Sequence, residues 1–185
     1  SKRVLAIKGI GKSFNDSMIE IYNNLAHHMP ENGTQVVMFT HQDVKVWSEL
    51  AMILWSSGLR VISAWNIATE TDSGGLKSGN YVKGTVLLTL KKHTATKKVY
   101  QDELYDEIKK EVEQMIDSMR DIEDKDDPDF TDADYLLAAY AASLKVLTSY
   151  QQIHGINVDY WLAQPRNGVE QNPVEALIQK AVKIA

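Results

Sequence analysis

Apolar and polar residues follow the periods of helices and strands along the first half of the chain. An amphipathic helical pattern covers residues 13–29, and a short β-branched apolar run covers 35–40. A continuous apolar run of this kind is typical of a buried parallel strand. A second helical pattern, bounded by an N-cap aspartate and a C-cap glycine, occupies 43–58, and two more strands are predicted at 60–69 and 82–90. The predicted order is therefore helix, strand, helix, strand, loop and strand.

The second half of the chain is predicted to be helical. Residues 101–122 keep a three/four apolar spacing among many acids, and an Asn-Pro pair at 172–173 opens a last amphipathic helix. Residues 131–150 begin at a capping-box pattern and are apolar nearly all round, which predicts a buried helix. The acidic helix presents an apolar stripe that needs a partner surface: Leu104, Ile108, Val112, Met115, Met119 and Ile122.

The charge distribution divides the chain into three parts. Its 185 residues suit one domain, or one domain with an appendage, and carry a formal charge of −5. Residues 1–92 carry +3, residues 93–134 carry −9, and residues 135–185 carry +1. We therefore expect a partial α/β domain at 1–92, an acidic helical connector at 93–130 and a C-terminal helical segment at 131–185.

Composition excludes several classes of protein. The chain has no cysteine, so it can form no disulfide, thiolate nucleophile or cysteine-ligated zinc site. Its uncharged apolar runs are too short to span a bilayer, and its first residues lack the apolar core of a signal peptide. A net charge of −5 argues against a surface built throughout for nucleic acid. We expect a cytoplasmic protein that does not enter a membrane.

Candidate functional residues follow two of the predicted strands. His41 and Gln42 lie just beyond the first strand, while Trp65 and Glu70 flank the end of the second. In open α/β sheets, ligands gather beyond the carboxyl ends of the strands. His41 could equally cap the following helix, and Trp65 could be a core residue, which is the commoner role of a large aromatic. The glycine-containing loop 71–79 has the composition of a mobile lid.

Several segments together carry a resemblance to one family of enzymes. These motifs are Phe14-Asn15-Asp16-Ser17, Pro30-Glu31-Asn32-Gly33, Val36-Val37-Met38-Phe39-Thr40-His41, Ser57-Gly58-Leu59-Arg60-Val61, Trp65, Thr69-Glu70, Gly84-Thr85-Val86-Leu87-Leu88, Thr131-Asp132-Ala133-Asp134-Tyr135 and Leu147-Thr148-Ser149-Tyr150. They look like the C-terminal half of the catalytic domain of DNA adenine methyltransferases. More narrowly, they resemble the large adenine-specific DNA methylases with a zinc-ribbon-like N-terminal region, often found among anti-phage defence genes. The resemblance covers nearly the whole chain.

The resemblance implies a fold and a site. It implies an α/β fold in which three strands form the distal end of a Rossmann-like methyltransferase sheet, followed by an α-helical appendage. The last strand would be antiparallel and inserted between its two neighbours. The full-length enzyme would bind DNA and S-adenosylmethionine. The target-base side of the site would be formed, without a catalytic group, by His41, Gln42, Trp65, Thr69 and Glu70.

Two motifs of the family are missing from this sequence. It has no glycine-containing cofactor loop at the expected place, and no Pro-Pro pair from the Asp/Asn-Pro-Pro-Tyr motif that holds a flipped adenine. In addition, Asn66 stands where the family pattern has proline after the tryptophan. We therefore expect a C-terminal fragment that neither binds the cofactor nor methylates DNA alone.

A different class of function is also compatible with the sequence. The chain could be a non-catalytic interaction module whose acidic helix at 101–122 docks a partner through its apolar stripe. Homo-oligomers could form through that helix or through an exposed sheet edge.

Overall fold

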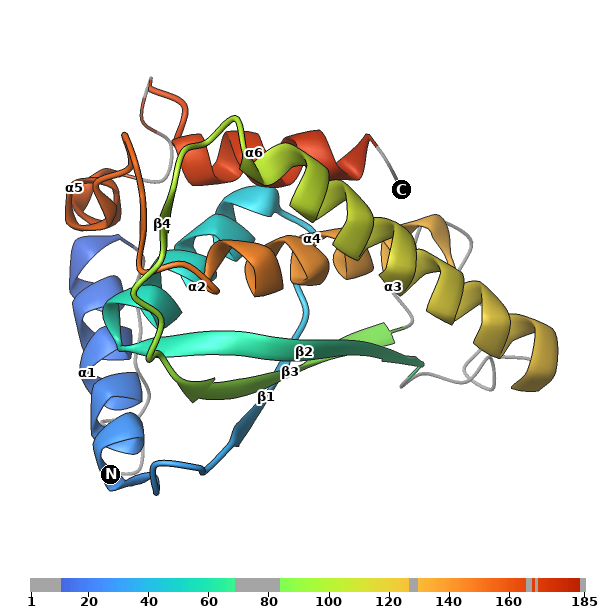
Figure 1. Ribbon diagram of the computed structural model, residues 1–185, viewed down its shortest axis with the longest axis horizontal. Coiled ribbons are helices and arrows are strands. Elements are labelled where there is room, and N and C mark those ends of the chain that lie inside the picture. Colours follow the sequence, from blue (N-terminus) through green and yellow to red (C-terminus); the bar gives the residue numbers. More distant parts are fainter. Residues whose placement is uncertain (1–10, 69–83, 127–129, 166–167, 169, 184–185) are drawn as a thin grey trace, which may run out of the picture.

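The computed structural model describes residues 11–68, 84–126, 130–165, 168 and 170–183, and these form a mixed α/β fold (Figure 1). The helices in these ranges are α1 (Lys12–His28), α2 (Val44–Ser56), α3 (Leu104–Asp126), α4 (Asp132–Leu147), α5 (Val158–Ala163) and α6 (Pro173–Val182). The strands are β1 (Gln35–Phe39), β2 (Leu59–Ala68), β3 (Gly84–Lys92), β4 (Lys98–Val99) and β5 (Gln152–Ile153). The predicted elements of the first half are confirmed as α1, β1, α2, β2 and β3.

Local capping interactions fix where several helices begin. The Asp43 side chain accepts a hydrogen bond from the Lys45 amide, 2.9 Å away, at the start of α2. Asn172 accepts in the same way from the Val174 amide, and proline occupies the first turn of α6. After α2, Gly58 has a φ of 68°, a left-handed conformation that suits glycine at a helix C-terminus. These caps confirm the helix starts expected at 43, 131 and 172.

The main sheet has three strands in the order β1-β3-β2. β3 is antiparallel to both neighbours, so β1 and β2 run parallel to each other on either side of it. Leu88 marks the register, since it lies opposite Val37 of β1 and Ala64 of β2. The register of β2 shifts between Val61 and Ser63. The expected insertion of an antiparallel last strand between the first two is confirmed.

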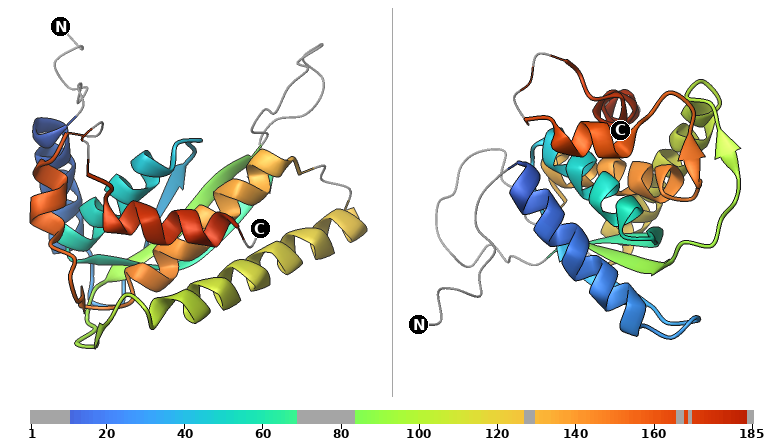
Figure 2. Two further views of the ribbon diagram at one scale, coloured as in Figure 1. Left: turned by 90° about the horizontal axis from the view of Figure 1, so that it is seen from above. Right: turned by 90° about the vertical axis from the view of Figure 1, so that its left-hand side faces the viewer.

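Helices cover one face of this sheet. Figures 1 and 2 show α2, α4 and α6 on the same side of the strands, with α4 against β2 and β3. Alternate residues of β3 face them, and Val86, Leu88 and Leu90 are completely buried. Residues from α1 to α6 belong to one continuous core, which joins the 1–92 part of the chain to the 131–185 part.

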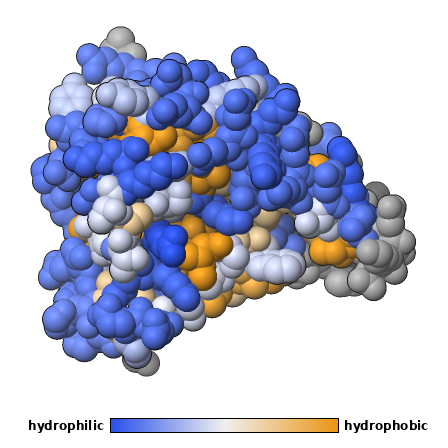
Figure 3. Space-filling view, in the orientation of Figure 1, coloured by the Kyte–Doolittle hydropathy of each residue, from blue (hydrophilic) through white to orange (hydrophobic). Residues whose placement is uncertain are grey.

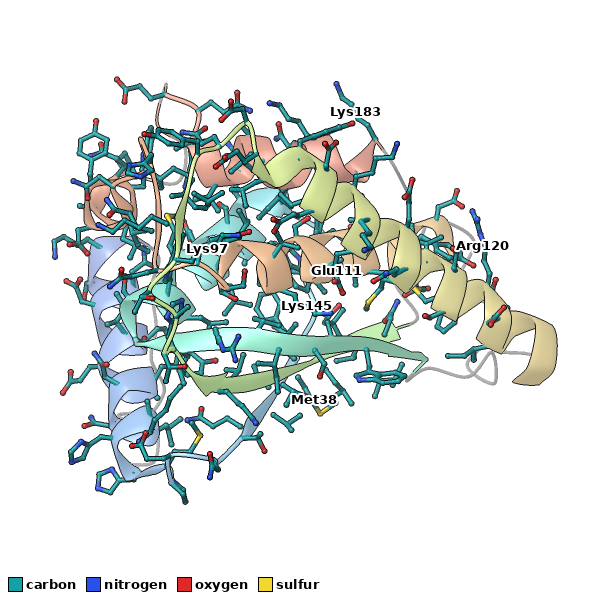
Figure 4. The ribbon with its side chains drawn as sticks, in the orientation of Figure 1. Met38, Lys97, Glu111, Arg120, Lys145 and Lys183 are labelled. Carbon is teal, nitrogen blue, oxygen red and sulfur yellow. The ribbon has the colours of Figure 1, made fainter. Side chains whose placement is uncertain are left out.

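The opposite face of the sheet is left open by the described residues. Val36 and Met38 of β1 are 63% and 62% exposed, and Trp65 of β2 is 58% exposed. Figure 4 shows Met38 below β2 and β3. Figure 3, in the same orientation, shows a hydrophobic (orange) patch in the lower centre of the view. The expectation of a buried strand at 35–40 is wrong for this face, because the helices that the structure describes pack on the other one.

The acidic helix α3 buries its apolar stripe inside the molecule. Its packing partners include α4 and α6, and an ion pair of 2.5 Å between Lys145 of α4 and Glu111 of α3 adds to the contact (Figure 4). The stripe that sequence analysis left without a partner is therefore covered by the chain itself. Its buried members are Leu104, Ile108, Val112 and Met119, and Ile116 of the same helix is buried beside them.

Two features of the second half were not predicted. β4 and β5 form a short parallel pair, and α5 follows it. Tyr150 anchors the region, because its hydroxyl hydrogen-bonds Glu107 and its carbonyl oxygen lies 2.9 Å from Nε2 of His93. Burial raises the Tyr150 pKa above its ordinary value, and the hydrogen bond to Glu107 adds to the effect.

None of the described helices has the length and apolarity needed to cross a membrane.

Candidate functional site

The parallel course of β1 and β2 brings their carboxyl ends to one edge of the sheet. Near this edge, Phe39 of β1 and Asn66 of β2 both lie opposite Val86 of β3. The first residue of β3, Gly84, lies at this same edge, and the first turn of α4 contacts it. This carboxyl edge is where ligands bind in open α/β sheets, so it is the candidate site.

His41 lies at this edge, and both its ring and its backbone are held in place. The Asp43 amide donates a hydrogen bond to His41 Nδ1 over 2.9 Å, and Trp47 Nε1 donates to the His41 carbonyl over 2.6 Å. Since Nδ1 accepts this hydrogen bond, the neutral ring carries its own proton on Nε2. The exposed ring of His41 can therefore donate a hydrogen bond to a ligand, while Nδ1 helps cap α2. Gln42 is exposed beside it.

A buried aromatic group supports this end of β1. Trp47 is fully buried and packs edge-on against Phe39, with ring centres 4.8 Å apart. Its ring also lies 5.7 Å from that of Tyr140 in α4. Burial raises the Tyr140 pKa, and the nearby Asp43 carboxylate raises it further. Packed side chains from β1, α2 and α4 therefore support the backbone around His41.

Trp65 does not have the core position that sequence analysis treated as the commoner alternative. It projects from the open face in a row with Leu87 and Met38. One side of Trp65 borders a cavity of about 250 Å³ between β2 and α3, which Met115 also lines. An exposed indole on a rigid strand can stack on a planar ligand. β3 separates Trp65 from His41, so the two residues share a sheet edge without touching.

A buried polar cluster at the carboxyl edge was missed by sequence analysis. Asp134 is completely buried, and its carboxylate accepts hydrogen bonds from the Gly84 amide at 2.8 Å and from the Thr131 amide at 2.9 Å. Asn66 Nδ2 donates to the Asp134 carbonyl over 3.0 Å. The cluster therefore ties the end of β2 and the start of β3 to α4. The capping-box spacing of Thr131 and Asp134 gave the helix start but not these long-range contacts.

This cluster explains two residue choices. A Cβ atom on Gly84 would lie 2.5 Å from Asn66 Oδ1 and 2.8 Å from an Asp134 carboxylate oxygen, so only glycine fits there. Asn66, found where the family pattern has proline, uses its side chain as a buried hydrogen-bond donor. Its Oδ1 atom is buried and has no hydrogen-bond partner among the described residues.

Two candidates and one loop cannot be placed. Thr69, Glu70 and the loop 71–79 lie outside the described residues. Within the described ranges, no three histidine, aspartate or glutamate side chains come together in a way that could hold a metal ion.

Comparison with known proteins identifies no relative. The chain matches no protein-family model, no curated protein and no solved structure. The function must therefore be argued from the site and the fold.

Proposed function

We propose that this chain is the C-terminal part of an S-adenosylmethionine-dependent, adenine-specific DNA methyltransferase. In this proposal, β1, β2 and β3 are the distal strands of a larger Rossmann-like sheet. The chain supplies part of the surface that faces the target base, while the cofactor loop and the Asp/Asn-Pro-Pro-Tyr motif belong to another part of the enzyme. The proposed setting is cytoplasmic, in anti-phage defence, and the chain alone does not transfer a methyl group.

The strand arrangement is the observation that carries this proposal. The resemblance implies a last strand that is antiparallel and inserted between two parallel neighbours, and the sheet has the order β1-β3-β2 with β3 reversed. The helices that precede β1 and β2 pack against each other, as helices on one face of a doubly wound sheet do. This order agrees with the one that the resemblance implies, and it therefore supports the methyltransferase proposal.

The open face and open edge of the sheet support the idea of a larger sheet. β1 is an outer strand, and its free edge could pair with another strand. Val36 and Met38 project from the same strand on the open face. Antiparallel sheets that leave one face in water normally carry polar residues on that face, whereas Val36 and Met38 are apolar. The rest of the proposed enzyme would extend the sheet at β1 and cover this face.

The candidate residues at the carboxyl edge suit a supporting role toward a base. His41 offers a ring N–H donor, Gln42 offers an amide, and Trp65 offers a face for stacking. Enzymes that act on a base hold it by stacking and by hydrogen bonds to its edge. Thr69 and Glu70 remain candidates by resemblance alone.

The alternative function, an interaction module, needs an apolar surface on α3 that is largely buried in this structure. An interaction module that docks a partner through the α3 stripe requires that stripe to be accessible, yet Leu104, Ile108 and Val112 are buried against other elements of the chain. Homo-oligomers through α3 would require the same residues. The free edges of the sheet remain available for association.

Calorimetric titration with S-adenosylmethionine tests the proposal. This chain is compared with a longer polypeptide, extended upstream to include any Pro-Pro-Tyr motif that the gene encodes. We expect saturable binding by the longer polypeptide and none by this chain. Binding by neither would contradict a methyltransferase, and binding by this chain alone would contradict the division of the site.

A further inference from the structure

A groove runs between the outer strand β2 and the helix α3. Two neighbouring cavities form it, one of about 480 Å³ beside Arg60 and one of about 250 Å³ beside Trp65. Glu111, Gln114 and Lys145 line both cavities, so the two are continuous. Figure 4 shows Glu111 and Lys145 between α3 and β2. The groove therefore follows much of the length of β2.

The strand edge that borders this groove has free hydrogen-bonding groups. Among the described strands β2 pairs with β3 only, so alternate backbone amides and carbonyls on its other side point away from the sheet. The Val61 amide donates to Thr148 Oγ1, at the end of α4, over 2.9 Å. Along residues 62–65, no hydrogen bond joins this outer side to any part of the chain that the structure describes. Unpaired backbone groups of a strand edge bind a further strand, so they select an extended peptide over a helix.

Arg60 brings an unpaired positive charge to one end of the groove. No hydrogen bond or ion pair joins its guanidinium group to a described residue, and its Nε atom is buried. Both carboxylates in the lining are already engaged, since Glu111 pairs with Lys145 and Glu107 accepts a hydrogen bond from a tyrosine hydroxyl. Lys110 adds a further ammonium group to the lining. A guanidinium group pairs with a carboxylate through two parallel hydrogen bonds, so this end of the groove favours an acidic side chain.

The other end of the groove is largely apolar. Ala64 of β2 and Met115, Met119 and Ile122 of α3 line the smaller cavity there, which suits an aliphatic side chain. Arg60 and Ala64 are four residues apart in the sequence of β2. Because side chains four residues apart on a strand share a face, the acidic and the aliphatic side chain of a bound peptide should also be about four residues apart.

We propose that the groove between β2 and α3 binds an extended peptide, which adds to the free edge of β2 as a further strand. An acidic side chain of the peptide pairs with Arg60, and an aliphatic side chain fills the apolar end beside Ala64 and Met115. The proposal does not rest on the methyltransferase proposal, which extends the sheet at β1, the strand on the opposite edge.

An NMR titration of the full chain with a short peptide tests this site. One probe is the peptide TETVTLTT, capped at both ends, and a second is its reversed sequence, which serves the opposite strand direction. Both place a glutamate and a leucine four residues apart among β-branched residues that favour an extended backbone. We expect one of them to bind saturably at about 1 mM or tighter, with the largest shifts in β2 and in the middle of α3. Alternate amides along residues 62–65 should become protected from hydrogen exchange, because they then donate to the peptide.

Matched changes separate strand addition from general attraction. Arg60→Met removes the guanidinium group but keeps an aliphatic stem, and it should weaken binding about tenfold. Lys183→Met removes one positive charge from an exposed position after α6 and should leave binding unchanged. A peptide with two prolines at its centre, TETPPLTT or its reverse, lacks backbone donors and should bind about tenfold more weakly or not at all. The peptide changes leave the chain unaltered, so they test the site whether or not a variant folds.

Four outcomes would overturn the proposal. The first is no saturable binding of either peptide by the unaltered chain at about 1 mM. The second is equal affinity of the Arg60→Met and Lys183→Met variants, which would exclude a role for the guanidinium group. The third is full affinity of the proline peptide, or unchanged exchange along residues 62–65, which would indicate side-chain contact without strand addition. The fourth is protection of the same amides that rises with protein concentration alone, which would assign the edge to a second copy of the chain.

Discussion

The two faces of the main sheet are built from similar residues but have different surroundings. On one face Val86 and Leu88 of β3 are completely buried under helices of the chain, while on the other Val36, Met38 and Trp65 are more than half exposed. Exposed apolar residues gathered on one rigid surface usually mark an interaction site. The difference indicates that the chain's own helices complete only half of the sheet's packing.

The covered face holds the apolar contacts that stabilise this fold. Burial of apolar side chains is the dominant favourable term in folding, and here it is concentrated where α2 and α4 meet β2 and β3. The open face adds little to that stability, since its side chains remain in water. Its apolar character is therefore explained better by a partner surface than by the folding of this chain.

The largest effect is expected from a change on the covered face. Leu88→Ala should lower the free energy of unfolding by about 2–5 kcal/mol, because it leaves a cavity beneath α4. Its neighbour Leu87 is partly exposed on the opposite face, so Leu87→Ala should cost about 1 kcal/mol or less. Urea denaturation of both variants measures the difference. Equal losses would mean that the open face is already covered in solution, for example by self-association.

The polar cluster at the carboxyl edge should give the next largest effect. Asp134→Asn replaces a buried acceptor with a group that presents N–H toward the donors of Gly84 or Thr131, so we expect a loss of about 1–3 kcal/mol. Asp132→Asn, an exposed position in the same helical turn, is the matched control and should change stability by less than about 0.5 kcal/mol. Thermal and urea unfolding would contradict the role of the cluster if the two variants behave alike.

The features predicted from sequence are those encoded by neighbouring residues. The helices α1 and α2 follow from their apolar spacing, and the starts of α2 and α4 follow from nearby caps such as Asp43. The start of α1 does not, because its N-cap is Gly11 and no side chain caps it. The contact between Asn66 and Asp134 joins residues 68 apart, and β4 pairs with β5 over two residues each. Such long-range contacts leave no periodic signal in one sequence.

The candidate site was predictable in position but not in detail. An apolar run followed by His41 indicated a strand end, and the sheet confirms that end. The same run could not indicate that Met38 would be exposed, because the sequence alone does not show whether an apolar residue is buried by its own chain or by a partner. Trp65 was more readily interpreted as a core residue for the same reason.

A charge on the open face should sharpen the comparison between the two faces. Met38→Glu should change the stability of this chain by less than about 0.5 kcal/mol, because residue 38 is 62% exposed. In the longer polypeptide the same substitution should abolish S-adenosylmethionine binding, since a carboxylate would be buried beneath the added elements. Leu25→Glu, at a 51% exposed site on α1, is the control and should be tolerated in both. Retained cofactor binding by the Met38 variant would contradict a covered open face.

The smallest effect on stability is expected at Trp65, whose indole is mostly in water. Trp65→Leu should leave the unfolding free energy nearly unchanged. It should shift the mean tryptophan emission to shorter wavelength, because Trp65 is the most exposed of the four tryptophans, while Trp47 is buried and Trp55 and Trp161 are partly buried. In the longer polypeptide, loss of a stacking face should weaken DNA binding about tenfold, since base stacking on an aromatic contributes roughly 1–3 kcal/mol. Trp65→Tyr keeps an aromatic face and should retain most of the affinity. Equal affinities of the leucine and tyrosine variants would show that Trp65 does not stack on a base. Trp65 would then be part of the same apolar open face as Met38, which the Met38→Glu variant tests.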